Sequence, residues 1–136
     1  METYNLEKEI KVFCVAATSF PDGVLEAHQT LHSKIAFTTE RKYFGISRPD
    51  NKGSIEYKAA AEELEEGELK KLGFEPFVIP KGKYLSLILK DFRKNISSIG
   101  QAFQQLIHQP GIDPQGYCIE WYIGMDDVRC MVRLSE

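Results

Sequence analysis

The stretch KVFCVAATSF at residues 11–20 returns in altered form as KYLSLILKDF at residues 83–92, and this repetition decides the fold. In both copies, apolar and β-branched residues predict a strand that runs into a turn. The two copies are 72 residues apart, since 83 − 11 = 72. The sequence therefore indicates an internal repeat.

Each copy of the repeat is followed by one helix and two further strands. Apolar residues at helical spacing predict helices near residues 21–35 and 94–108. Alternating apolar residues then predict a strand pair in each half, at 43–47 with 55–58 and at 117–123 with 128–134. We therefore expect an α+β protein built from two βαββ halves.

Each half alone has one amphipathic helix and a small sheet with unpaired edges, which is too little to be stable by itself. We expect the pseudo-symmetric halves, about 8–62 and 74–135, to form a single domain over residues 1–136. They would form a joined antiparallel sheet with the helices on one face and a ligand cleft on the other. Residues 59–73 have a helical composition, but the repeat predicts that the preceding strand continues to about Ala61 and that a short helix or loop follows. Residues 74–83 predict a proline-bounded edge strand and a turn.

The composition is that of a globular protein. The chain has 136 residues, 43% hydrophobic content and a formal charge of −3, without the basic stripe that direct nucleic-acid binding needs. A polar start and the absence of a long apolar run argue against a signal peptide and a membrane span, so we expect a cytoplasmic protein. The three cysteines, Cys14, Cys118 and Cys130, have no CxxC spacing and predict buried thiols.

No cofactor or metal is predicted from the motifs. The chain has neither a glycine-rich phosphate loop nor a dinucleotide fingerprint. His28 and His32 are four residues apart, which is a metal-ligand spacing, but no HExxH motif surrounds them. Because His28 belongs to the apolar stripe of its helix, we expect a structural histidine.

Glu120 is the only acidic residue within either strand of the second hairpin, and it alternates with aromatic residues. Side chains alternate across a strand, so Glu120 and Tyr122 share one face. Two readings stay open: a surface glutamate paired with Arg129 or Arg133, or the floor of an aromatic-walled pocket for a cationic or hydrogen-bond-donating ligand. Under both interpretations, we expect Glu120 to face away from the helix. The helix would pack on two apolar rows, which are Ile119, Trp121 and Ile123 in one strand and Val128, Cys130, Val132 and Leu134 in the other.

Several of these features together resemble the GyrI-like effector-binding domain. They are the repeat, the segment IPKGKY at 79–84, Phe103 with Leu106 in the second helix, and Glu120 with Tyr122 in the hairpin. This domain is the small-molecule module of gyrase-inhibitory proteins and of transcription activators of the MerR and AraC types. The resemblance covers nearly all of the chain, but residues 1–9 are too short for the helix-turn-helix of those activators.

The resemblance implies a ligand cleft between the two halves with the strand glutamate at its centre and aromatic residues around it. On this sequence those roles fall on Glu120 and Tyr122. Some relatives are hydrolases of cyclopropane-bearing toxins that use the same carboxylate, so Glu120 is the catalytic candidate if the chain is an enzyme.

Strand parity extends the candidate site into the rest of the sheet. Setting Gly45 equivalent to Glu120, at an offset of 120 − 45 = 75, places Tyr43 on the open face. In the strand that begins at Lys83, the leucines match the helix side, so Tyr84 faces the cleft. The predicted ligand-binding residues are therefore Glu120, Tyr122, Tyr43 and Tyr84. The same parity predicts that Ile55 and Tyr57 face the helices, while Glu56 and Lys58 lie on the opposite face.

The preferred function is a stand-alone binding protein for a small molecule that is aromatic and cationic, or a hydrogen-bond donor. A detoxifying hydrolase of strained electrophiles is the alternative from the enzyme class, with Glu120 taking a proton from water. A third reading is a protein that interacts with a macromolecule such as gyrase through the acidic residues 62–68. Neither membrane binding nor direct nucleic-acid binding is expected.

Overall fold

The computed structural model describes residues 1–50 and 52–135 and confirms the α+β class. Two α-helices and eight strands follow one another along the described chain, with two short 3₁₀ turns, η1 and η2, between them. The elements are β1 (Glu2–Leu6), β2 (Ile10–Ala16), α1 (Val24–Lys34), β3 (Tyr43–Pro49), β4 (Ile55–Glu62), η1 (Lys70–Leu72), β5 (Glu75–Ile79), β6 (Gly82–Leu89), η2 (Phe92–Lys94), α2 (Ser97–Ile107), β7 (Cys118–Ile123) and β8 (Asp127–Arg133).

The chain forms two compact units. One consists of Met1–Lys8 together with Pro80–Glu136, and the other of the continuous segment Glu9–Ile79. We call them the discontinuous unit and the continuous unit. Each unit has a four-stranded antiparallel sheet and one α-helix. The two βαββ halves of the repeat are thus confirmed, while the assignment of the whole chain to a single domain stays a prediction.

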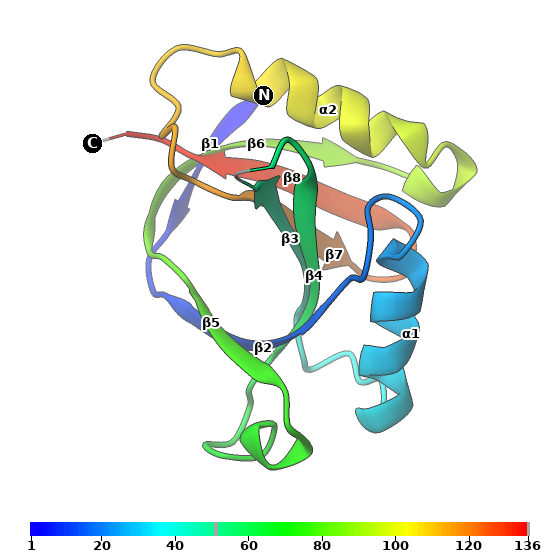
Figure 1. Cartoon of the computed structure of the whole chain (residues 1–136). Coiled ribbons are helices and arrows are strands. Elements are labelled where there is room, and N and C mark those ends of the chain that lie inside the picture. Colours follow the sequence, from blue (N-terminus) through cyan, green and yellow to red (C-terminus); the bar gives the residue numbers. More distant parts are fainter. Residues whose placement is uncertain (51, 136) are drawn as a thin grey trace. The chain divides into compact units, whose positions relative to one another are not determined.

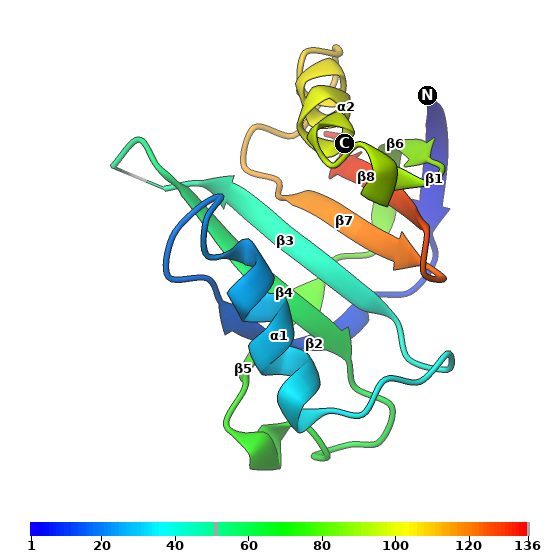
Figure 2. The same cartoon turned by 90° about the vertical axis from the view of Figure 1, so that its right-hand side faces the viewer.

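The continuous unit has the strand order β3-β4-β2-β5. Helix α1 packs on β4 and β2, as Figure 2 shows, and buries Ala27 and Leu31 against them. Strand β4 continues to Glu62, and only the short turn η1 follows before β5, so the repeat predicted this segment better than its helical composition did. The predicted proline-bounded strand is confirmed as β5, at the edge of this unit's sheet.

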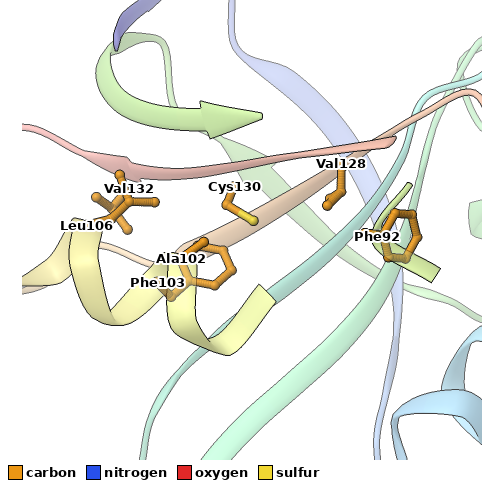
Figure 3. Packing of buried hydrophobic residues seen from close by; sticks show 7 residues of the cluster. All are labelled: Phe92, Ala102, Phe103, Leu106, Val128, Cys130 and Val132. Atoms are coloured by element: carbon orange, nitrogen blue, oxygen red, sulfur yellow. The ribbon is translucent and has the colours of Figure 1, made fainter. Parts of the chain in front are cut away.

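The discontinuous unit has the equivalent order, β7-β8-β6-β1. Helix α2 lies along β6 and β8 in Figure 1. Figure 3 shows the apolar contact between helix and sheet, in which Phe103 and Leu106 of α2 meet Cys130 and Val132 of β8. Leu85, Leu87 and Leu89 of β6 pack against the same cluster, as predicted from parity.

Each sheet takes one outer strand from the chain segment that leads into the other sheet. Strand β1 leads along the chain into β2 but pairs with β6, from Glu2 opposite Ser86 to Leu6 opposite Gly82. Strand β5 leads into β6 but pairs with β2. The halves predicted from sequence, about 8–62 and 74–135, therefore differ from the compact units at these two strands.

The strand registers confirm that Gly45 and Glu120 occupy equivalent positions. Gly45 lies opposite Ala59, and Glu120 lies opposite Cys130. Ala59 and Cys130 are themselves 71 residues apart. The same separation holds for Ala61, which lies opposite Phe13 of β2, and Val132, which lies opposite Leu85 of β6. The offset of 75 between β3 and β7 thus matches the two sheets strand by strand.

The predicted hairpin between β7 and β8 is present, with Ile123 opposite Asp127 across a tight turn. Gly124 in this turn has φ +61°, a left-handed conformation that glycine adopts without a steric penalty. No helix among the described residues is long and apolar enough to cross a membrane.

Candidate functional site

Glu120 and Tyr122 face α2, which corrects the orientation predicted from sequence. Glu120 lies opposite Cys130 and Tyr122 opposite Val128 in the antiparallel pair of β7 and β8. Residues opposite one another in such a pair point to the same face. Cys130 and Val128 belong to the cluster under α2, so the row of Glu120 lies on the helix side and the row of Trp121 on the other.

The alternative of a surface ion pair between Glu120 and an arginine of β8 is also wrong. Arg129 lies opposite Trp121, and Arg133 lies opposite Tyr84. Both arginines are therefore on the face away from α2, with the sheet between them and the carboxylate.

The carboxylate of Glu120 is buried and hydrogen-bonded to a phenol. Glu120 is 8% exposed, and it is the only acidic or basic residue among the described residues that are buried as a whole. The Tyr122 hydroxyl donates a hydrogen bond of 2.5 Å to Glu120 Oε1. The Tyr122 ring packs on Phe92, with 5.8 Å between ring centroids, and Phe92 belongs to the cluster under α2. The site thus joins a carboxylate, a phenol and an apolar wall.

Two thiols share the helix side of this hairpin with Glu120. Burial and, to a smaller extent, the Glu120 charge raise the pKa of Cys118 to about 11. Burial, then the charge of Glu120 and then Cys118, raise the pKa of Cys130 to about 12. Both cysteines are therefore protonated at neutral pH and are poor nucleophiles.

Tyr84 does not join Glu120. It lies opposite Arg133 on the face of the discontinuous unit's sheet that is turned away from α2. Tyr84 is 1% exposed, and its hydroxyl donates a 2.5 Å hydrogen bond to the Pro80 carbonyl. Burial raises the pKa of Tyr84 to about 12. The predicted wall of four residues is therefore divided, because the sheet separates Tyr84 from Glu120.

Tyr43 lies in the continuous unit, on the α1 side of β3, so its predicted position on the face away from the helices is wrong. Its ring centroid is 5.0 Å from that of His32 in α1 and 5.3 Å from that of Phe37, with which it stacks at 14°. The Thr38 N–H donates a 3.1 Å hydrogen bond to the Tyr43 hydroxyl. Burial lowers the pKa of His32, so this aromatic group is neutral at pH 7.

A second aromatic group on the α1 side was not predicted as a site. His28 Nε2 is 2.8 Å from the Tyr57 hydroxyl, and Phe20 stacks on the Tyr57 ring with centroids 6.0 Å apart. The prediction that Tyr57 faces the helix is confirmed, as is the structural environment expected for His28. The sequence did contain a signal for this pair, because His28 belongs to the apolar stripe of its helix and Tyr57 to the strand row that faces the helices.

The acidic residues 62–68 are partly neutralised by basic side chains. Arg41 Nη1 is 2.7 Å from Glu68 Oε1, Lys42 Nζ is 3.5 Å from Glu62 Oε2, and Lys11 Nζ is 3.6 Å from Glu63 Oε1. This segment therefore presents less negative charge than its sequence suggests. Gyrase binding through it stays a prediction.

An open surface pocket of about 370 Å³ lies in the discontinuous unit and does not include Glu120. It is lined by Asn5, Leu6, Glu7, Lys81, Gly82 and Arg133. In the described part of the chain, no three His, Cys, Asp or Glu side chains gather in an arrangement that could hold a metal ion.

Comparison with solved structures supports the fold but not a family. An integron cassette protein from the mobile metagenome of Vibrio cholerae superposes with a TM-score of 0.75 at 12% identity, over 98% of this chain and 94% of that one. A hydrolase from Listeria innocua superposes with a TM-score of 0.59 at 10% identity, over 98% of this chain and 90% of that one. No family model and no curated protein sequence matches the chain. The resemblance to GyrI-like domains therefore stays a prediction from sequence.

Proposed function

We propose that this chain binds a small organic molecule through Glu120, and that the ligand is an aromatic cation or another hydrogen-bond donor. The observation that carries the proposal is the burial of the Glu120 carboxylate at 8% exposure, beside the Tyr122 hydroxyl at 2.5 Å. Among the described residues, Glu120 is the only acidic or basic one that is buried as a whole, and the Glu63 side chain, at 5% exposure, is also largely covered.

Burial is what makes this carboxylate a strong candidate for ligand recognition. A charged group taken out of water costs several kcal/mol unless other groups compensate it, and a ligand cation can provide that compensation. In a poorly solvated site the attraction between the carboxylate and a ligand cation is stronger than in water. Tyr122 and Phe92 add aromatic surface next to the charge, and aromatic faces attract cations.

The sequence resemblance to GyrI-like effector-binding domains supports the same function, because it assigns the central role to the strand glutamate. The structural neighbours support the fold alone, at 12% and 10% identity. Glu120 and Tyr122 lie on the α2 side of the hairpin and Tyr84 lies on the other face of the sheet, so the site that we propose does not include Tyr84.

Substitution of Glu120 by glutamine tests the proposal with a matched pair of ligands. The cation 1-methylquinolinium and the neutral 1-methylnaphthalene have the same shape and differ in charge. We expect Glu120→Gln to weaken binding of the cation by more than about tenfold, which corresponds to about 1.4 kcal/mol, and to change binding of the neutral compound by less than about twofold. Titration calorimetry or ligand fluorescence measures both constants.

Glu66→Gln is the control, because Glu66 is exposed and makes no ion pair or hydrogen bond among the described residues. It should leave both constants unchanged. Equal losses for the cation and the neutral compound in Glu120→Gln would exclude a charge-specific role, and failure of the wild-type protein to bind either compound would count against this ligand class.

A hydrolase is the second candidate, and one contact favours it. The hydrogen bond of 2.5 Å from Tyr122 orients Glu120 Oε1, and a carboxylate held beside a phenol is a suitable pair for activating water and donating a proton. The protonated thiols of Cys118 and Cys130 are poor nucleophiles, so such an enzyme would act through water. The structural neighbour from Listeria innocua is described as a hydrolase, but at 10% identity this likeness shows the fold alone.

A further inference from the structure

The face of the discontinuous unit's sheet that is turned away from α2 carries a group of charged and aromatic side chains around Arg129. Glu2 of β1 lies opposite Ser86 of β6, and Trp121 of β7 lies opposite Arg129 of β8. Tyr4 follows Glu2 on the same face of β1. Four strands thus contribute to one polar and aromatic surface, separate from the Glu120 site on the other face.

Arg129 is held in one orientation by three contacts. Its Nη1 donates to Ser86 Oγ at 3.1 Å and to Glu2 Oε1 at 3.1 Å. The guanidinium carbon lies 4.3 Å from the centroid of the Tyr4 ring, a cation–π arrangement. The Arg129 side chain is only 15% exposed, so the guanidinium is partly desolvated as well as oriented.

The contacts use one of the three guanidinium nitrogens. Nε and Nη2 have no hydrogen-bond partner among the described residues. These two nitrogens form the planar side-on fork of an arginine, and the fork matches the two oxygens of a carboxylate. Arg129 thus presents a pre-oriented fork, so less side-chain entropy is lost when it binds an anion.

The two hydrogen-bond acceptors on Nη1 differ in how firmly they are held. Ser86 is 0% exposed and fixed within the sheet. The Glu2 side chain is 60% exposed in the edge strand, and exposed ion pairs of this kind contribute little. A ligand carboxylate can therefore replace Glu2 as the negatively charged partner of Arg129, while Ser86 and Tyr4 keep the guanidinium in place.

Aromatic surface lies next to this fork. The rings of Tyr4 and Trp121 meet edge to face, with centroids 5.8 Å apart and an interplanar angle of 87°. Both residues are half-buried and leave part of their surface to solvent. We propose that Arg129, Ser86, Tyr4 and Trp121 form a binding site for a small aromatic carboxylate, with the carboxylate on the Arg129 fork and the ring against Tyr4 and Trp121.

Trp121 is the only tryptophan in the chain, so its emission reports on this site alone. The probe is 4-nitrobenzoate, whose nitroaromatic ring quenches tryptophan by contact, and its neutral match is 4-nitrobenzamide. We expect saturable quenching by 4-nitrobenzoate with a Kd below about 1 mM, confirmed by calorimetry, and binding of the amide weaker by about tenfold or more.

Three variants separate the proposal from nonspecific binding. Arg129→Lys keeps the charge but removes the fork, and should weaken 4-nitrobenzoate binding by about tenfold. Glu2→Gln removes the competing carboxylate and should strengthen it by up to about fivefold. Arg48→Lys, at a surface arginine paired with Glu56 in the continuous unit, is the matched control and should change nothing.

Thermal unfolding verifies that each variant is folded, and Glu2→Gln gives an independent result if Arg129→Lys is not. The proposal is overturned by the absence of saturable quenching at about 1 mM, by equal affinity for the acid and the amide, or by weaker binding in Glu2→Gln. Glu120→Gln should leave 4-nitrobenzoate binding unchanged, since Glu120 lies on the other face of the sheet; a large loss there would also overturn it.

Discussion

At the scale of single residues, one ion pair of the continuous unit links Glu68, in the segment after β4, to Arg41, which lies two residues before β3. Arg41 Nη1 donates to Glu68 Oε1 at 2.7 Å and Nη2 to Glu68 Oε2 at 3.3 Å. Nη1 also donates to the Glu62 carbonyl at 2.6 Å, and the Leu64 N–H donates to Glu68 Oε1 at 2.7 Å. The hydrogen bond from Arg41 is the main cause that lowers the pKa of Glu68 to about 2.

This lowered pKa predicts a specific pH dependence of stability. The folded pKa lies below the usual value of 4.5, so the stabilisation is fully present above pH 4.5 and is lost as the pH falls towards about 2. The thermal midpoint of Glu68→Gln should therefore lie below that of the wild type at pH 6 or so, and the gap should narrow through this window. Glu66→Gln should show no such gap, and a gap that stays constant with pH would contradict the prediction.

The residues of the candidate site show how far strand alternation leads. Strand alternation correctly placed Glu120 and Tyr122 on one face of β7 and Trp121 on the other. It could not show which of the two faces packs against the helix. Apolar burial normally decides this, yet Ile119 at 2% exposure and Glu120 at 8% are both buried, on opposite faces of β7. A strand buried on both faces gives no such signal, and the presence of a charged residue favoured the wrong choice.

At the scale of elements, β1 is the strand that the sequence did not reveal. Its residues ETYNL are mostly polar, and its partner β6 lies about eighty residues further along the chain. Only Leu6, at 7% exposure, is fully buried in β1. Local pattern therefore gave no reason to expect a strand, whereas the α-helices and the hairpins, with their closer contacts and stronger periodicity, were predicted within a few residues.

Deletion of residues 1–8 tests the contribution of β1 to the discontinuous unit. It removes five residue pairings with β6 and exposes a new sheet edge next to Tyr84. We expect faster hydrogen exchange at the β6 amides that face β1, because these amides lose their partners. The amides that pair β2 with β4 in the continuous unit serve as the internal control and should keep their protection. Equal acceleration in both sheets would show that β1 has no local role.

At the scale of the whole molecule, the repeat predicted the equivalent order of elements in the two units but not the exchange of their outer strands. The continuous unit is a single segment, Glu9–Ile79, whereas the other unit needs both ends of the chain. An exchange of β1 and β5 leaves the composition and periodicity of each half unchanged, so no local pattern reports it. The register of the inner strands, in contrast, follows from the repeat itself, as the equivalence of Gly45 and Glu120 shows.

The last prediction concerns the activity of the molecule and separates a binding protein from a hydrolase. Both functions need Glu120, so loss of function in Glu120→Gln cannot distinguish them, and only the number of reaction cycles can. We expect an excess of an activated cyclopropane, such as a cyclopropane-1,1-dicarboxylate diester, to be recovered without conversion. Mass spectrometry of the compound after incubation with wild type and Glu120→Gln gives the amount of product per protein molecule. Many turnovers in the wild type that disappear in the variant would instead show that the carboxylate held beside Tyr122 activates water.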